Sequence, residues 1–74
     1  MTTMTFESFK KQFGSRLAQL RKERGITQEQ LARTMKMDTV SIAYIETAQR
    51  GPSFQTIFKL SKALKVQPDE LFRF

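Results

Sequence analysis

The chain has 74 residues, a length that allows one domain with a small core. It contains no Cys and no His, which excludes disulfides, thiolate chemistry, imidazole acid–base catalysis and the common zinc sites. Thirteen Lys and Arg stand against seven Asp and Glu, so the formal net charge is +6. An excess of cations of this size is typical of proteins that bind phosphate, and nucleic acid is the first candidate partner.

A membrane partner is not expected. No stretch approaches the roughly 18 apolar residues of a transmembrane helix, and the N-terminus lacks the apolar run of a signal peptide. No segment is both strongly basic and openly apolar, so an anionic membrane surface is also disfavoured. We therefore expect a cytoplasmic protein. No motif for a metal, a cofactor or a small-molecule ligand is visible, and we expect none of these.

Helical periodicity begins near the N-terminus. Thr5 is the predicted N-cap of a first helix that runs to about Arg24, where Gly25 provides a left-handed stop. Gly14 interrupts this helix at a cost of about 1 kcal/mol relative to Ala. An alternative is therefore that the domain begins at Gly14 and that residues 1–13 form an added helical arm. The apolar stripe of the segment consists of Phe6, Phe9, Phe13, Leu17 and Leu20.

Two short helices follow, joined by a tight turn. Thr27 and Gln30 form a capping box at the start of the second helix, and Asp38 is the predicted N-cap of the third. The pattern of residues 27–47 therefore predicts a helix-turn-helix, with the turn at residues 36–37. Its expected buried positions are Leu31, Ala32, Met37, Ile42 and Ile45. This spacing lets the third helix turn its other face outward, a geometry that enters the major groove of DNA.

The C-terminal third predicts two more helices. After a loop over residues 48–52, Ser53 caps the fourth helix. Pro68 is the expected first residue of a short fifth helix, with acidic side chains at its positive end. The apolar face of the fourth helix is predicted to consist of Phe54, Ile57, Phe58, Leu60 and Leu64. The expected fold is a single all-α domain of five helices that spans residues 1–74.

An ordered set of short motifs runs through the chain. These are Gly14-Ser15-Arg16-Leu17, Leu20-Arg21, Gly25-Ile26-Thr27-Gln28, Leu31-Ala32, Ile42, Ile45-Glu46, Arg50, Pro52-Ser53 and Ala63-Leu64-Lys65-Val66. With these motifs, residues 14–72 resemble the lambda-repressor-like helix-turn-helix domain of Cro/cI-type (XRE-like) regulators, which include phage repressors and restriction–modification controller proteins. The resemblance implies a sequence-specific transcriptional regulator that binds a two-fold DNA operator as a homodimer, with residues 38–47 in the major groove.

Three positions depart from the family pattern. The family usually carries Gly where Lys36, Ala48 and Lys65 stand in this chain. These sites favour a positive φ, which costs a non-glycine residue about 1–2 kcal/mol. We therefore expect some strain in three turns.

The resemblance implies base contacts from Thr39, Val40 and Tyr44, and we add Ala43 because the helical wheel places it on the same face. This face has no Arg, Asn or Gln, the side chains that make bidentate contacts with bases. Direct readout would then depend on thymine methyl groups, and DNA shape would supply the remaining specificity.

Contacts with the DNA backbone are expected around that face. The resemblance implies that Gln28 holds a phosphate at the N-terminus of the second helix, and the alternative is a plain helix-start residue. The other expected backbone contacts are Arg33, Lys36, Ser41, Thr47, Gln49 and Arg50.

Two further expectations concern structure rather than DNA. The family pairs the positions of Arg21 and Glu46 in a partly buried salt bridge that fixes the angle of the third helix. Near the C-terminus, apolar side chains are costly unless they are covered. They would either form a dimer interface or fold back against Phe6 and Phe9. These residues are Leu71, Phe72 and Phe74.

Other functions remain in competition with DNA binding. The outward face of the third helix would also suit a protein-binding module or an antitoxin. An enzyme is not expected, because the carboxylates are scattered and the chain has no nucleophile motif or phosphate loop.

Overall fold

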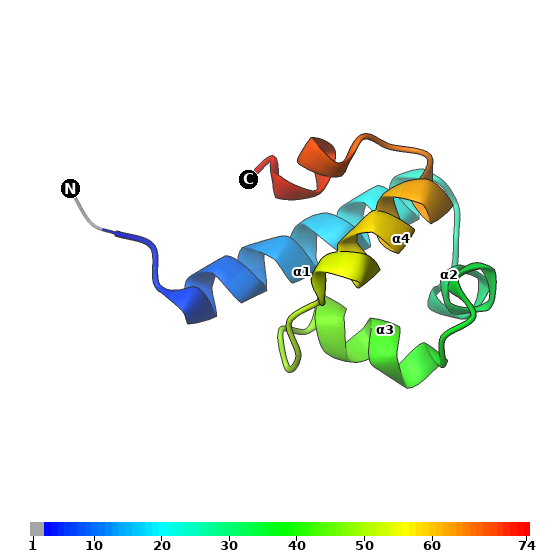
Figure 1. Cartoon of the computed structure of the whole chain (residues 1–74), viewed down its shortest axis with the longest axis horizontal. Coiled ribbons are helices and arrows are strands. Elements are labelled where there is room, and N and C mark those ends of the chain that lie inside the picture. The colour runs from blue at the N-terminus through cyan, green and yellow to red at the C-terminus, as the bar shows by residue number, and fades with distance from the viewer. Residues whose placement is uncertain (1–2) are drawn as a thin grey trace.

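The computed structural model describes residues 3–74, and within them all regular secondary structure is helical (Figure 1). The elements are α1 (Phe6–Glu23), α2 (Gln28–Met35), α3 (Thr39–Glu46), α4 (Phe54–Leu64) and the 3-10 helix η1 (Pro68–Phe72). The expected all-α class is confirmed, but the expected count of five helices is not matched, because the structure has four α-helices and a 3-10 turn. The last element is a short 3-10 turn, and it ends where Arg73 leaves the helical region with ψ 81°.

Side-chain caps set where the four α-helices begin, as predicted. In each case the hydroxyl or carboxylate oxygen of the N-cap accepts a hydrogen bond from the backbone N–H three residues later, at 3.0 to 3.1 Å. At α2 the side chain of Gln30 also accepts from the backbone N–H of Thr27, which completes the predicted capping box. The four N-caps are Thr5, Thr27, Asp38 and Ser53.

Helix α1 runs through Gly14 without a break, so residues 6–13 form its first half rather than a separate arm. Residues 1 and 2 of the expected arm lie outside the described residues. Gly14 is required by packing: a Cβ atom at this position would lie 2.5 Å from the carbonyl oxygen of Glu46 and 2.6 Å from that of Ile45. Only glycine therefore lets α1 approach the C-terminal end of α3 this closely.

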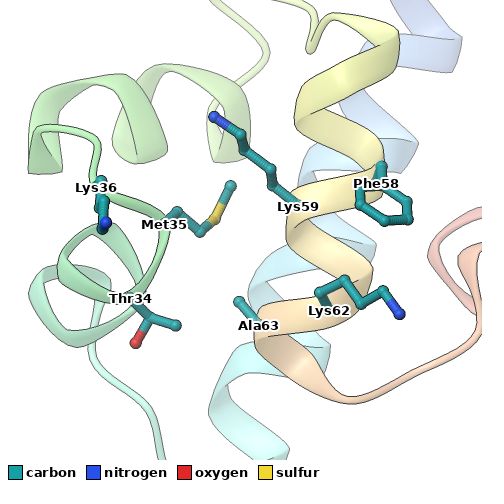
Figure 2. Close-up of a pocket in the computed structure, with 7 residues that line it drawn as sticks. All are labelled: Thr34, Met35, Lys36, Phe58, Lys59, Lys62 and Ala63. Atoms are coloured by element: carbon teal, nitrogen blue, oxygen red, sulfur yellow. The ribbon is translucent and has the colours of Figure 1, made fainter.

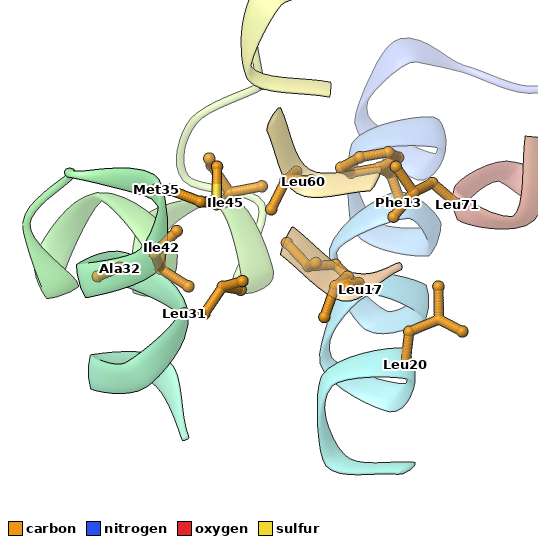
Figure 3. Packing of buried hydrophobic residues seen from close by; sticks show 11 residues of the cluster. Phe13, Leu17, Leu20, Leu31, Ala32, Met35, Ile42, Ile45, Leu60 and Leu71 are labelled. Carbon is orange, nitrogen blue, oxygen red and sulfur yellow. The ribbon is translucent and has the colours of Figure 1, made fainter. Parts of the chain in front are cut away.

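One hydrophobic core lies between α1, α4 and the α2–α3 pair (Figure 3). Ile42 and Ile45 of α3 are 0% and 3% exposed, and they pack toward α2 and α1. Met37, expected in the core, is only half-buried. The other buried apolar residues are Phe13, Leu17, Leu20, Leu31, Ala32, Met35, Leu60, Leu64 and Leu71.

Four phenylalanines that were predicted on apolar helix faces do not belong to this core. Phe54 and Phe58 of α4 are 92% and 57% exposed, and Phe6 and Phe9 of α1 are 67% and 39% exposed. The predicted stripes are wider than the surface that each helix buries: on α1 burial begins at Phe13, and on α4 the buried residues are Leu60, Ser61 and Leu64. Each of these exposed rings offers apolar surface that the chain itself does not cover.

The three positions with a missing glycine adopt the left-handed conformation, as predicted. Lys36, Ala48 and Lys65 have φ of 56°, 65° and 58°, and Gly25 ends α1 with φ 65°. The surrounding structure holds these residues in a conformation that costs a non-glycine residue free energy. Between residues 3 and 74, no helix is long and apolar enough to cross a bilayer.

Candidate nucleic-acid interface

Helix α3 has two faces with opposite environments. Ile42 and Ile45 point into the core, whereas Val40 is 56% exposed and Tyr44 is 38% exposed. Thr39 and Ala43 are half-buried beside them. The four residues expected to contact bases thus form one accessible strip along α3, which lies at the lower edge of the molecule in Figure 1.

A network of hydrogen bonds ties the end of α3 to α1 and to the start of α2. Arg21 donates from Nε to Oε2 of Glu46 at 2.7 Å and from Nη2 to Oε1 at 3.1 Å. A third donor of Arg21, Nη1, binds the carbonyl oxygen of Ile26 at 2.8 Å. Both side chains of the pair are at most 10% exposed. This pair fixes α3 against α1, because a planar guanidinium held at three points has little freedom to move.

Gln28 takes part in the same network. Its Nε2 donates to Oε1 of Glu46 at 3.0 Å, which joins the first residue of α2 to the last residue of α3. One N–H and the carbonyl oxygen of the amide remain for other partners. The position of Gln28 is therefore set by Glu46, a long-range contact that the sequence did not reveal.

The tip of α3 carries a well-anchored carboxylate. Asp38 accepts from the backbone N–H of Ser41 at 3.1 Å and from its hydroxyl at 2.9 Å. Chiefly the backbone hydrogen bond from Ser41, together with the hydroxyl and the nearby charge of Arg50, lowers the pKa of Asp38 below 3.8. The hydroxyl of Ser41 is thus used in capping.

Arg50 lies across the exposed strip of α3. Its guanidinium carbon is 5.3 Å from the centre of the Tyr44 ring, and its Nη1 is 3.4 Å from the Ser41 hydroxyl. From the sequence, this arginine was expected to contact the DNA backbone, and the base-reading face was expected to lack Arg. The loop between α3 and α4 in fact returns a cation to that face, where it stacks on Tyr44.

The other expected backbone contacts lie around this strip. Thr47 donates its hydroxyl to the carbonyl of Ala43 at 2.8 Å, and Gln49 donates from Nε2 to Thr47 at 3.2 Å. Arg33 and Lys36 are exposed at the end of α2. Lys22 was not predicted, but with Gln28 and Thr39 it lines a shallow depression between the starts of α2 and α3.

The three C-terminal residues expected at a dimer interface have different environments. Leu71 is fully buried, so it offers no surface to a second copy. The Phe72 ring contacts Phe13 and Phe9 with centroids 5.1 and 6.1 Å apart, and Phe74 lies 5.8 Å from Phe9. Both rings remain 37% to 45% exposed. The C-terminus therefore folds back on α1 and still leaves part of its aromatic surface open.

Comparison with known proteins identifies this arrangement. Residues 17–71 match the family model described as helix-turn-helix. The chain belongs to this helix-turn-helix family of XRE-like regulators. It is 34% identical over 62 residues to the uncharacterized HTH-type transcriptional regulator y4dJ of Sinorhizobium fredii, and the match covers 84% of this chain and 80% of that protein.

Solved structures of regulators have the same fold. The restriction-modification controller protein C.AhdI from Aeromonas hydrophila is 40% identical with a TM-score of 0.82, over 84% of this chain and 94% of that chain. The P22 c2 repressor protein, solved in complex with a synthetic operator, is 31% identical with a TM-score of 0.75, over 82% and 92% of the two chains. The homologues of this helix-turn-helix chain are transcriptional regulators.

Proposed function

We propose that the chain is a sequence-specific DNA-binding regulator that places α3 in the major groove. The observation that carries this proposal is the exposed strip of Val40 and Tyr44 on a helix whose opposite side is fixed in the core. Thr39, Val40, Ala43 and Tyr44 would contact base edges. Val40 and Ala43 would touch thymine methyl groups, and Arg50, stacked on Tyr44, would supply a donor to a base or a phosphate.

Backbone phosphates would be held on both sides of this strip. At the N-terminus of α2, the free backbone N–H groups and the remaining amide N–H of Gln28 would bind a phosphate at the shallow depression that Gln28, Lys22 and Glu29 line. Side chains beyond α3 would hold a second stretch of backbone. They are Arg33, Lys36, Ser41, Thr47, Gln49 and Arg50.

Two copies would bind one operator. A single α3 of eight residues can reach only a few base pairs, whereas two copies related by a two-fold axis would read half-sites about 34 Å apart. We therefore propose a homodimer on a palindromic operator, in the manner of a Cro-like repressor or a controller protein.

A salt titration tests the proposal. Fluorescence anisotropy with a random-sequence duplex should show weak binding, with a dissociation constant in the micromolar range or above, that falls steeply between about 50 and 200 mM salt. Replacement of Arg33 by Ala should reduce the slope of log K against log salt by about one unit. The absence of binding at ~50 mM salt would contradict DNA binding.

The exposed Val40 supports one alternative, a protein-binding module or antitoxin that docks a partner on the same strip. The two functions differ in one measurement. A docking strip of apolar side chains should bind its partner with little salt dependence, whereas DNA binding should lose affinity as salt rises.

A further inference from the structure

A hollow with aromatic walls lies at the end of the molecule opposite the start of α2. The first turns of α1 form one wall with Phe6 and Phe9, η1 adds Phe72, and the α3–α4 loop and α4 add Pro52 and Ile57. We call this hollow the aromatic groove. It is open to solvent, since Phe6 is 67% exposed and Phe72 is 37% exposed.

A projecting side chain stands beside the aromatic groove. Phe54 is the first residue of α4 and is 92% exposed, the highest value among the large apolar side chains of residues 3–74. Its neighbours in the chain, Pro52 and Ile57, line the groove. One surface therefore carries both a knob and a hollow, the arrangement that a two-fold symmetric contact requires.

We infer that Phe54 of one copy inserts into the aromatic groove of a second copy, and that the second copy returns the same contact. This inference rests on the proposed homodimer and assigns its interface. In this interface the central side chain is Phe54 and not Leu71, which is buried. Phe72 remains part of the interface as a wall of the aromatic groove.

The local charge favours a second copy at this surface. The chain carries a net charge of +6, so most faces of one copy would repel the same face of a second copy. Lys10, however, the one charged residue among those that line the aromatic groove, is paired with Glu7 at 3.3 Å. Two copies can approach there with little repulsion between their charges.

The exposed area is of the size that an interface needs. The exposed parts of Phe6, Phe9, Phe54, Phe72 and Phe74 amount to roughly 500 Å², since a phenylalanine side chain presents about 150–250 Å². This is a large share of the roughly 800 Å² that each partner buries in a stable interface. The largest apolar patch on a typical monomer is about 300–600 Å² and is often functional, so an exposed apolar area of this size suits a binding surface.

A second apolar hollow differs in charge. It is lined by Met35, Phe58 and Ala63 together with three lysines, Lys36, Lys59 and Lys62, and Phe58 and Lys62 project from the side of α4 turned away from α2 (Figure 2). The ammonium group of Lys62 lies 5.4 Å from the centre of the Phe58 ring. Two such cationic borders would repel each other, so Phe58 lies outside the proposed interface. It is the matched control for Phe54, being the same residue type one turn further along α4.

The position of the proposed Phe54 contact in the fold also suits the geometry of a two-fold operator. The α3–α4 loop leads directly from the end of α3 to Phe54, so the proposed contact lies next to the C-terminal end of α3 (Figure 1). A two-fold axis at this end leaves the exposed strip of each α3 free. The two strips would then face the same side of the dimer, as two half-sites on one DNA face require.

Sedimentation equilibrium of the wild type, Phe54→Ser and Phe58→Ser tests the inference without DNA. We expect a wild-type dimer, a dimer dissociation constant raised at least about 30-fold by Phe54→Ser, and no change with Phe58→Ser. Circular dichroism should show equal helix content in all three proteins, because both side chains are exposed. A monomeric wild type, or an equal dimer dissociation constant for Phe54→Ser and Phe58→Ser, would overturn the inference.

Cross-linking locates the contact. The chain has no cysteine, so single-cysteine variants react only where they are placed. Oxidation of a mixture of Phe54→Cys and Phe6→Cys chains should yield a disulfide-linked pair of one of each, whereas Phe58→Cys with Phe6→Cys should not. No link in the first mixture would overturn the inference. Binding of random duplex DNA at low salt by Phe54→Ser separates this outcome from a failure of the proposed function, because a monomer should still bind DNA.

Discussion

Arg21 and Glu46 form a bidentate ion pair across α1 and α3, with Nε–Oε2 and Nη2–Oε1 distances of 2.7 and 3.1 Å. We expect Glu46→Ala to lower the free energy of unfolding by about 3 kcal/mol, because it leaves the guanidinium of Arg21 buried without its partner. For a chain of this size the melting temperature should fall by more than about 10 °C, even without DNA. Thermal unfolding followed by circular dichroism measures both quantities.

The exposed pair of Arg73 and Asp69 is the control. Its side chains are 63% and 67% exposed, so solvent screens their attraction. Asp69→Ala should leave the melting temperature nearly unchanged. Equal effects of the two substitutions would show that burial of the Arg21–Glu46 pair does not matter for stability.

Gly14→Ala sets two effects against each other. Alanine should stabilise a helix by about 1 kcal/mol relative to glycine. Its Cβ atom, however, would meet the backbone carbonyls of Glu46 and Ile45, which cannot rotate away. Overpacking of this kind costs about 1–3 kcal/mol, and we expect a net loss of stability in urea unfolding. Gly51→Ala should be nearly neutral, since its Cβ would lie 3.7 Å from the Lys10 side chain. A more stable Gly14→Ala protein would contradict the close approach of α1 and α3.

A glycine at position 65 should relieve backbone strain in the turn after α4. Lys65 has φ 58°, a conformation that costs a non-glycine residue about 1–2 kcal/mol. We expect Lys65→Gly to stabilise the protein by about 0.5–1 kcal/mol, because the added freedom of the unfolded chain offsets part of the gain. Lys59→Gly, in the middle of α4, should instead destabilise it by about 1 kcal/mol. If both variants lost stability, the left-handed conformation of Lys65 would carry no strain.

The cap of α3 should depend on pH. Hydrogen bonds from Ser41 lower the pKa of Asp38 below its usual value of 3.8 in the folded state. The charged cap therefore contributes stability above about pH 4, and this contribution is lost as pH falls through the lowered pKa. Comparison of melting temperatures between pH 2 and 6 should show a smaller acid loss for Asp38→Asn, which caps without titrating. Parallel curves for both proteins would contradict the assignment.

The sequence predicted those features of the fold that arise from neighbouring residues. The caps at Thr5, Thr27, Asp38 and Ser53 depend on a side chain and an N–H three residues away, so local pattern suffices to find them. The fifth helix was wrong in type, because the departure of Arg73 from helical geometry has no clear sequence signal.

Exposure was harder to predict than helix position. Phe54 and Phe58 have the spacing of an apolar face, but the pattern does not show where the neighbouring elements end. The contact of Gln28 with Glu46 and the stacking of Arg50 on Tyr44 depend on how segments pack in space. Within the candidate site, helical periodicity in the sequence therefore predicted which residues share the exposed strip on α3. The position of Arg50 over that strip is visible only in the structure.

Selection of bound duplexes from a random DNA pool tests the central claim most directly. The wild type should enrich a palindrome with half-sites about one helical turn apart. Val40→Ala and Tyr44→Ala should relax the base preference at symmetric positions of that palindrome, whereas the control Phe58→Ser should not. No enriched sequence with the wild type, or the same preferred bases with Val40→Ala and Tyr44→Ala as with the wild type, would contradict the claim that the exposed strip of α3 reads DNA.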